Sequence, residues 1–130
     1  MPAGDQRLAG LRILAVEDME LNRIVLDDML ENEGATVIFA EHGQQALGLL
    51  EKQGEPAFDV ILTDIQMPVM DGYELAQHAR LRQPGLPVIG LTAHAMPEER
   101  QRCLSSGMVA HVSKPIDCNT LIATILQHVA

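Results

Sequence analysis

Several residue types are scarce or missing in this sequence, and each shortage narrows its structural class. Tryptophan is absent, and the aromatic residues are one tyrosine and two phenylalanines. A folded core must therefore be built from aliphatic side chains, with methionine as a filler. The two cysteines, Cys103 and Cys118, lack metal-ligand spacing, so the reduced thiols of a cytoplasmic protein are the default expectation. No apolar run approaches the length that a membrane-spanning helix needs.

Positive charge is also in short supply, since nine lysines and arginines face 18 aspartates and glutamates, for a net charge of −9. The sequence has no basic stripe, and we therefore expect no direct nucleic-acid partner. Residues 1–10 lack the apolar segment of a signal peptide and are expected to form a loose linker or N-terminal extension. Residues 11–130 have the size of one domain, and the hydrophobic content of 47% is that of a globular protein.

Short β-forming runs alternate with amphipathic stretches along the rest of the chain. The runs predict strands at 11–16, 35–40, 58–63, 87–91 and 108–112. Helical periodicity predicts helices from 21 to a stop near 34, and over 42–52, 73–81, 97–105 and 118–129. Such strict alternation favours parallel strands joined by right-handed helical crossovers. The predicted fold is therefore α/β, a doubly wound, five-stranded parallel sheet with five helices.

The stretch at 60–72, VILTDIQMPVMDG, is the centre of this arrangement. Its apolar, β-forming start predicts a strand buried on both faces, with Asp64 at the carboxyl end. Open α/β sheets bind their ligands at that edge. Pro68 has no backbone N–H and a restricted φ, so the strand cannot continue through it. A single Asp after a strand is most often a turn cap, and the case for Asp64 depends on the other strand ends.

Polar side chains follow four of the five predicted strands: Glu17 and Asp18, Asp64, Thr92, and Lys114. Three carboxylates in one pocket repel one another, and a hard cation such as Mg²⁺ would relieve that repulsion. Asp64 could then be a nucleophile that forms an aspartyl phosphate, with Thr92 and Lys114 neutralising phosphoryl oxygens. Taken singly, each residue is better explained as a helix-starting acid, a cap or a turn lysine. Their combination is what indicates a phosphoryl-transfer site.

The sequence resembles the receiver domains of two-component response regulators and phosphorelays over nearly its whole length. The matching stretches are ILAVEDMELN, VILTDIQMPVMDG, PVIGLTAHAM and HVSKPID. The resemblance implies a flavodoxin-like receiver topology, with Asp64 as the phosphoacceptor and a metal ligand. It also implies a Mg²⁺ site in which Asp18 is a direct ligand and Glu17 acts mostly through water. The backbone carbonyl of Gln66 is a further ligand by the same resemblance.

The resemblance also assigns supporting roles around the acceptor. Thr92 and Lys114 are expected to bind the phosphate and to carry the signal. Met67 and Pro68 are expected to shape the loop that follows the acceptor. His111 stands where many receivers carry Tyr or Phe, so the phosphoryl chemistry is expected to be intact while the usual aromatic switch is in doubt.

Two positions near the acceptor leave alternatives open. His94 and Gln66 flank the approach to the phosphate, where family members tune phosphate loss, and a rim role without effect is equally open. A Mg²⁺-dependent aspartyl-phosphate hydrolase is a competing function, but such enzymes need a second Asp where this chain has Gln66. A flavin-binding module is disfavoured as well, because the acidic loop EDMEL would repel a flavin phosphate.

A finer pattern, EDMELNRIVL with LTAHAM and GMVAHVSKP, resembles receivers attached to hybrid sensor histidine kinases. It implies a histidine kinase and a His-containing phosphotransfer domain as partners, a cytoplasmic location, and no direct membrane contact from this segment. It also implies a domain that catalyses its own phosphorylation and dephosphorylation, whereas a longer parent could be a membrane-anchored kinase. The alternative is a stand-alone single-domain response regulator, because no kinase core or output domain is recognised in the 130 residues.

Overall fold

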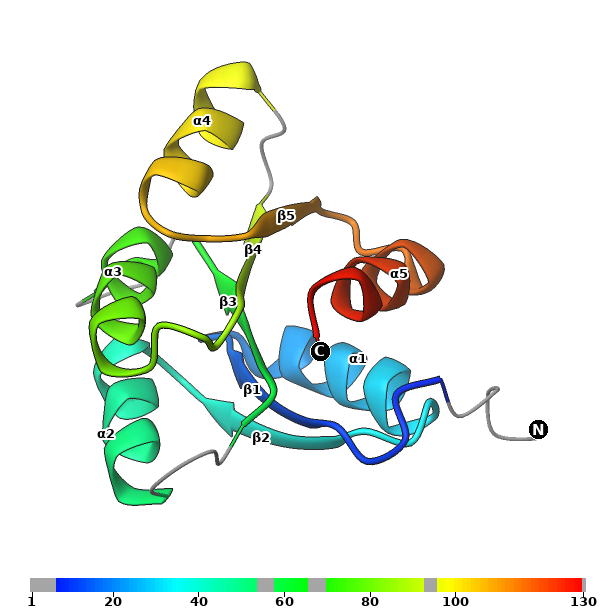
Figure 1. Ribbon diagram of the computed structural model, residues 1–130. Helices are drawn as coiled ribbons and strands as arrows, with labels where there is room; N and C mark the ends of the chain where they lie inside the picture. The colour runs from blue at the N-terminus through cyan, green and yellow to red at the C-terminus, as the bar shows by residue number, and fades with distance from the viewer. Residues whose placement is uncertain (1–6, 54–57, 66–69, 93–95, 130) are drawn as a thin grey trace.

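The computed structural model describes residues 7–53, 58–65, 70–92 and 96–129 of the chain. Within these ranges, five parallel strands form one sheet in the order β2-β1-β3-β4-β5 (Figure 1). The strands are β1 (Arg12–Val16), β2 (Thr36–Ala40), β3 (Val60–Asp64), β4 (Val88–Thr92) and β5 (Ala110–Ser113). The chain runs from β1 out to the edge at β2 and then returns to β3. The strand order therefore reverses between β1 and β3, and sheets of this kind bind ligands at the carboxyl ends of those strands.

The described residues contain five helices, of which the first four connect successive strands and the fifth follows β5. They are α1 (Glu20–Glu31), α2 (Gly43–Gln53), α3 (Gly72–Arg82), α4 (Pro97–Ser105) and α5 (Cys118–His128). Helices α1 and α5 lie on one face of the sheet, and α2 and α3 lie on the other (Figure 1). The doubly wound fold predicted from the sequence is confirmed. None of the described helices combines the length and apolar character needed to cross a membrane.

The centre of the sheet is buried on both faces. Strands β3 and β4 are buried at every position, which explains why their sequences are apolar runs without alternation. Successive side chains of β3 point to opposite faces. Val60 and Leu62 join the core beneath α1 and α5, whereas Ile61 joins the core beneath α2 and α3. Both cores are mainly aliphatic, as the scarcity of aromatic residues predicts.

Residues 7–10, which the sequence places in a loose N-terminal segment, are folded onto the domain. We call them the N-terminal arm. Leu8 is 0% exposed within the core beneath α1 and α5, and its N–H donates to the Glu33 carbonyl at 2.8 Å. The Arg7 guanidinium forms an ion pair with the Glu33 carboxylate, with Nε and Oε1 3.1 Å apart. Leu8 lies outside the predicted strand at 11–16 and belongs to no periodic pattern, so the sequence gives no sign of this packing. The domain boundary at residue 11 stays a prediction.

The start of α3 places the chain that follows β3 close to the acidic end of that strand. Asp71 is the N-cap of α3, and with Glu74 it forms a capping box in which each side chain accepts from the backbone N–H of the other residue. The Gly72 N–H donates to the Ile65 carbonyl at 2.8 Å. A Cβ atom at Gly72 would lie 2.6 Å from the Asp64 carbonyl oxygen, so only glycine allows this approach.

Candidate functional site

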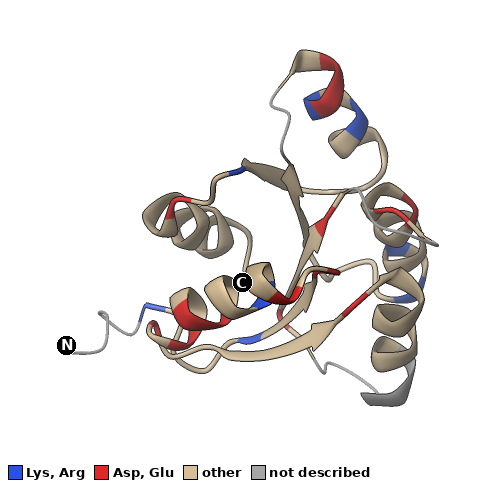
Figure 2. Ribbon diagram, turned by 180° about the vertical axis from the view of Figure 1, so that it is seen from behind, with Lys and Arg blue, Asp and Glu red and all other residues tan. Residues whose placement is uncertain are grey.

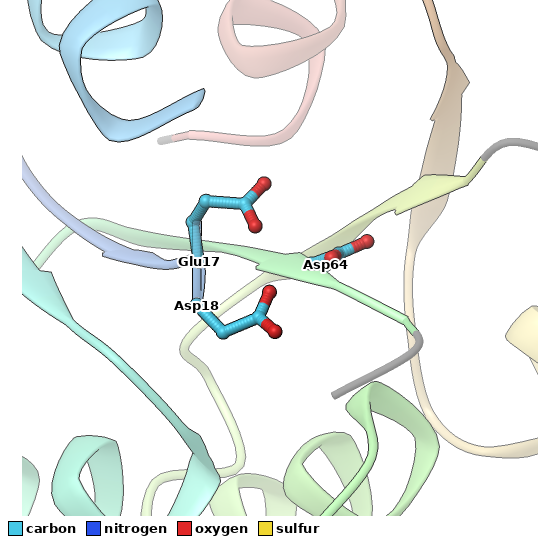
Figure 3. A group of neighbouring side chains, drawn as sticks. All are labelled: Glu17, Asp18 and Asp64. Atoms are coloured by element: carbon cyan, nitrogen blue, oxygen red, sulfur yellow. The ribbon is translucent and has the colours of Figure 1, made fainter. Parts of the chain in front are cut away.

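Three carboxylates meet at the carboxyl ends of β1 and β3. Glu17 and Asp18 directly follow β1, and Asp64 is the last residue of β3. Figure 3 shows the Glu17 and Asp18 side chains pointing from β1 toward Asp64. One carboxylate oxygen from each residue lies within 4.8 Å of those from the other two. We call this group of three side chains the acidic cluster, and it is brought together by the strand order that places β1 beside β3.

Lys114, which follows β5, supplies the opposing charge. Its ammonium donates to Asp64 Oδ1 at 3.1 Å and lies 3.5 Å from Glu17 Oε1. Its backbone N–H donates to the carbonyl of Thr92 at 2.7 Å, which fixes the β5 end beside the β4 end. Thr92 is buried at that same edge. The structure therefore brings together all five residues that the sequence singled out at strand ends.

Burial makes the charge of Glu17 unfavourable. Glu17 is 0% exposed, and burial raises the pKa of its carboxyl, with a further increase from the nearby Asp64 charge. Its Oε2 accepts from the Met19 N–H at 3.2 Å, whereas its Oε1 accepts no hydrogen bond among the described residues. The Lys114 ammonium near Oε1 is an ion-pair partner and not a hydrogen-bond donor. A buried carboxylate oxygen that accepts no hydrogen bond can serve as a ligand to a cation.

The donor set of the acidic cluster fits a hard divalent cation. All three side chains offer carboxylate oxygens, which Mg²⁺ and similar ions prefer to nitrogen or sulfur. Among the described residues, Lys114 is the base that contacts these carboxylates, so three acids against one ammonium leave excess negative charge within the cluster. The hydrogen bonds that described residues make to the Asp64 carboxylate, from the Ile65 N–H at 3.0 Å and from Lys114, both go to Oδ1. Asp64 is thus held in place through one of its two oxygens.

Arg23 is a supporting residue that the sequence did not reveal. Its guanidinium Nη1 donates to the Glu17 carbonyl at 2.9 Å, and its Nη2 lies 3.8 Å from Glu41 Oε1. These contacts tie α1 to the turn that carries Glu17 and Asp18. In the sequence, Arg23 looks like any exposed arginine on a helix. No sequence pattern distinguishes it from one that makes no such contacts.

Some positions predicted from the sequence lie elsewhere or cannot be placed. Gln66, Met67, Pro68 and His94 lie outside the described residues. His111 is half-buried on the edge strand β5, with Gly90 of β4 as its register partner. The next residue, Val112, joins the core beneath α1 and α5, so alternation directs His111 to the opposite face of the sheet.

Comparison with known protein families gives one match that spans most of the chain. The family described as the response regulator receiver domain matches residues 13–126. The sensor histidine kinase RcsC of Salmonella typhimurium is 45% identical over 117 residues, which are 88% of this chain but only 12% of that protein. An uncharacterised 14.6 kDa protein of Leptolyngbya boryana is 41% identical over 95% of this chain and 93% of its own length.

Solved structures give the same result. The Vibrio cholerae chemotaxis protein CheY4 superposes with a TM-score of 0.85 at 31% identity, over 93% of this chain and 100% of that one. The receiver domain of the Pseudomonas aeruginosa sensor histidine kinase PA1611, solved with magnesium in its active site cleft, gives 0.82 at 34% identity over 92% and 98%. The receiver domain of Saccharomyces cerevisiae Ssk1, solved with the histidine phosphotransfer protein Ypd1, gives 0.81 at 26% identity over 91% and 88%.

Proposed function

The chain belongs to the response regulator receiver domain family, and on this premise we propose that it is a phosphorelay switch whose phosphoacceptor is Asp64. The observation that supports this assignment most directly is the contact of the Lys114 ammonium with Asp64 beside two further carboxylates. Asp64 ends a fully buried strand at the position where the strand order reverses. Its carboxylate is therefore held by a rigid element and faces the ligand-binding edge of the sheet.

The proposed reaction moves a phosphoryl group from a phosphohistidine to Asp64. An oxygen of the Asp64 carboxylate attacks phosphorus, and the phosphorus–nitrogen bond breaks with its electron pair staying on the donor imidazole. Lys114 neutralises negative charge on the phosphoryl oxygens as the new bond forms, since it already contacts Asp64. Thr92, at the end of β4, would offer its hydroxyl to another phosphoryl oxygen.

Mg²⁺ is the cofactor that the acidic cluster would hold. Asp18 and Asp64 would be its side-chain ligands, Glu17 would act mostly through water, and the Gln66 carbonyl would complete the set of protein ligands. The bound ion would supply positive charge that offsets the cluster and the phosphoryl oxygens. Two observations support the proposal: the Glu17 oxygen that accepts no hydrogen bond from a described residue, and the magnesium reported in the related receiver of PA1611.

The proposed partner is a helical His-containing phosphotransfer domain, with a histidine kinase upstream in the relay. The start of α1, beside the acidic cluster, exposes apolar side chains at Leu21 (68%), Ile24 (58%) and Val25 (44%). Exposed apolar groups next to a reactive centre are what a docking protein would cover. The Ssk1 receiver, solved with the phosphotransfer protein Ypd1, is a related case.

The setting of the domain is a further part of the proposal. The chain spans only 12% of RcsC. We propose that residues 11–130 are the receiver domain of a hybrid sensor kinase and lie in its cytoplasmic part. A stand-alone regulator is the second candidate, because the Leptolyngbya protein is nearly covered by the match. The coding sequence that flanks this segment decides between them.

The acceptor assignment is tested by intact mass after incubation with acetyl phosphate and Mg²⁺. Wild type should gain the mass of one phosphoryl group, and addition of a chelator should prevent the gain. Asp64→Asn should gain nothing. Asp28→Asn, which changes an exposed acid of α1 outside the cluster, should behave as wild type. Equal modification of Asp64→Asn and wild type would remove Asp64 as the acceptor.

A further inference from the structure

Helix α4 is held to the domain by few buried side chains. Cys103 is the one residue described as buried along its length. The helix stands away from the sheet, and it carries acidic residues in its first turn and arginines further along (Figures 1 and 2). A helix with so little buried surface can change position at small energetic cost, so the few contacts that fix it matter.

Tyr73, in the first turn of α3, contacts α4 through its side chain. The Tyr73 hydroxyl donates a hydrogen bond to the Glu99 carboxylate of α4. The guanidinium of Arg102 lies over the Tyr73 ring, 4.2 Å from its centre. Glu99 and Arg102 are three residues apart and therefore share one face of α4. We call this group of three side chains the α3–α4 latch.

The hydrogen bond between Tyr73 and Glu99 is expected to persist at neutral pH. Tyr73 is 6% exposed, and burial, followed by the hydrogen bond to Glu99, raises the pKa of its hydroxyl well above the usual range. The hydroxyl therefore remains protonated and can donate. The hydrogen bond has a charged acceptor and lies in a partly buried place, where such bonds are stronger than those between neutral groups.

The latch is joined to the acceptor by a short path through the backbone. Gly72, directly before Tyr73, packs so close to the Asp64 carbonyl that no side chain fits between them. Tyr73 also shares a core cluster with Ile65, the residue after Asp64, and with Cys103 of α4. On the other side, α4 follows β4 after only a short connection, so Thr92 and Glu99 are close in the chain.

We propose that the α3–α4 latch is a conformational device that couples the phosphorylation state of Asp64 to the position of α4. In the unphosphorylated protein Tyr73 holds Glu99 and Arg102, and α4 is fixed. A phosphoryl group on Asp64 attracts the Thr92 hydroxyl and alters the packing around Gly72. Both ends of the latch then move, and the Tyr73–Glu99 hydrogen bond breaks. The proposal rests on Asp64 being the acceptor, and it gives α4 a switch contact that does not depend on His111.

The chain offers a direct probe, because Tyr73 is its single tyrosine and tryptophan is absent. A phenol that donates to a carboxylate loses fluorescence by proton transfer in its excited state. Phosphorylation with acetyl phosphate and Mg²⁺ should therefore increase tyrosine emission as the latch opens. Glu99→Gln should be brighter than wild type before phosphorylation and should change little on phosphorylation. Glu98→Gln, one residue away on exposed helix surface, is the matched control and should respond as wild type.

A second variant tests whether the Tyr73 hydroxyl responds to phosphorylation or is only a packing contact. Tyr73→Phe keeps the ring and its contact with Arg102 but removes the hydroxyl. Amide exchange in α4 should become roughly fivefold faster in the unphosphorylated state, as expected for loss of one hydrogen bond, and should then change little on phosphorylation. The rate of Asp64 phosphorylation should stay within a few fold of wild type.

Intact mass measured on the same samples distinguishes the two ways of failing. If Asp64 gains no phosphoryl group, the proposed function is wrong. If Asp64 is phosphorylated while tyrosine emission and α4 exchange in wild type stay unchanged, the latch is only a packing contact and this proposal is overturned. The same holds if Tyr73→Phe leaves the response of α4 to phosphorylation intact.

Discussion

Glu17, at the residue scale, shows how a functional position differs from a structural one. Its carboxylate is buried, its pKa is raised by burial, and one of its oxygens accepts no hydrogen bond from the part of the chain that the structure describes. A side chain selected for stability alone would be apolar at this position, since a buried charge is unfavourable without full pairing. The arrangement makes sense if a cation completes it.

Mg²⁺ should therefore stabilise the unphosphorylated protein. A ligand that binds only the folded state adds RT ln(1 + [L]/Kd), or about 2.7 kcal/mol at 100 times Kd. Thermal melting of wild type should occur at higher temperature in millimolar Mg²⁺ than in EDTA, and the difference should vanish in Asp18→Asn. Asp28→Asn should keep it. A wild-type melting temperature that stays constant through a Mg²⁺ titration would show that the cluster binds no ion.

His111 should affect partner binding and leave the chemistry unchanged. It lies half-buried on β5 and faces away from the core that contains Val112. His111→Ala and His111→Tyr should both be phosphorylated within a few fold of the wild-type rate. Their affinities for a cognate phosphotransfer domain should differ, because imidazole gains less from burial than a phenol ring does. The idea fails if His111→Ala cannot be phosphorylated, or if every affinity matches that of wild type.

Capping fixes the start of α3 at the scale of single elements. Asp71 and Glu74 satisfy backbone N–H groups that the helix itself leaves unpaired. The position of this N-cap matters because Gly72 and Tyr73 are the next two residues. Gly72 packs against the Asp64 carbonyl, and Tyr73 belongs to the α3–α4 latch. The cap therefore sets the geometry of the latch as well as that of the helix.

Asp71→Ala should destabilise the protein by about 1 kcal/mol, the usual cost of removing a side-chain N-cap. Urea unfolding measures this change directly. Glu74→Gln is the suitable control, because glutamine can also accept the hydrogen bond from the Asp71 N–H and should cost much less. An unchanged unfolding midpoint in Asp71→Ala would mean that solvent replaces the cap without loss.

The N-terminal arm matters at the scale of the whole molecule, because it joins distant parts of the chain. Arg7 contacts Glu33 after the end of α1 and Asn119 in the first turn of α5. Leu8 fills a position in the core between those helices. Residues 7–10 are therefore packed as part of the folded unit.

Leu8→Ala should destabilise the protein by about 2–5 kcal/mol, as for other leucines removed from cores. Leu81→Ala is the control, because Leu81 is 80% exposed and its loss should change stability by about 0.5 kcal/mol at most. Both are measured by urea unfolding. If the two variants unfold at the same urea concentration, the arm does not pack as described.

The arm should also make stability depend on pH. The hydrogen bond from Arg7 lowers the pKa of the Glu33 carboxyl. A lowered folded-state pKa contributes stability that is fully present above the unfolded value, about 4.3, and is lost as the pH falls through the folded value. Wild type should thus exceed Arg7→Ala in stability at neutral pH, and the two should converge on acidification. If the difference in unfolding free energy between wild type and Arg7→Ala stays constant until both unfold in acid, the Arg7–Glu33 contact does not cause the pH dependence.

Sequence patterns predicted the type and order of all the described elements, with ends that differ by a few residues. The fifth strand, for example, begins at Ala110 and not at 108. The acidic cluster was predictable for a simple reason, since the carboxyl ends of parallel strands share one edge wherever each strand lies in the order. Residue types at strand ends were enough to indicate it.

Local periodicity and the polarity of strand ends were enough to predict the fold and the gathering of Glu17, Asp18, Asp64, Thr92 and Lys114 at one edge of the sheet. The contacts between individual side chains depend on the tertiary structure. Tyr73 and Glu99, like Arg7 and Glu33, are 26 positions apart, and Lys114 and Asp64 are 50 apart. Such contacts depend on how whole helices and strands pack, and no local pattern records the distance between side chains on separate elements.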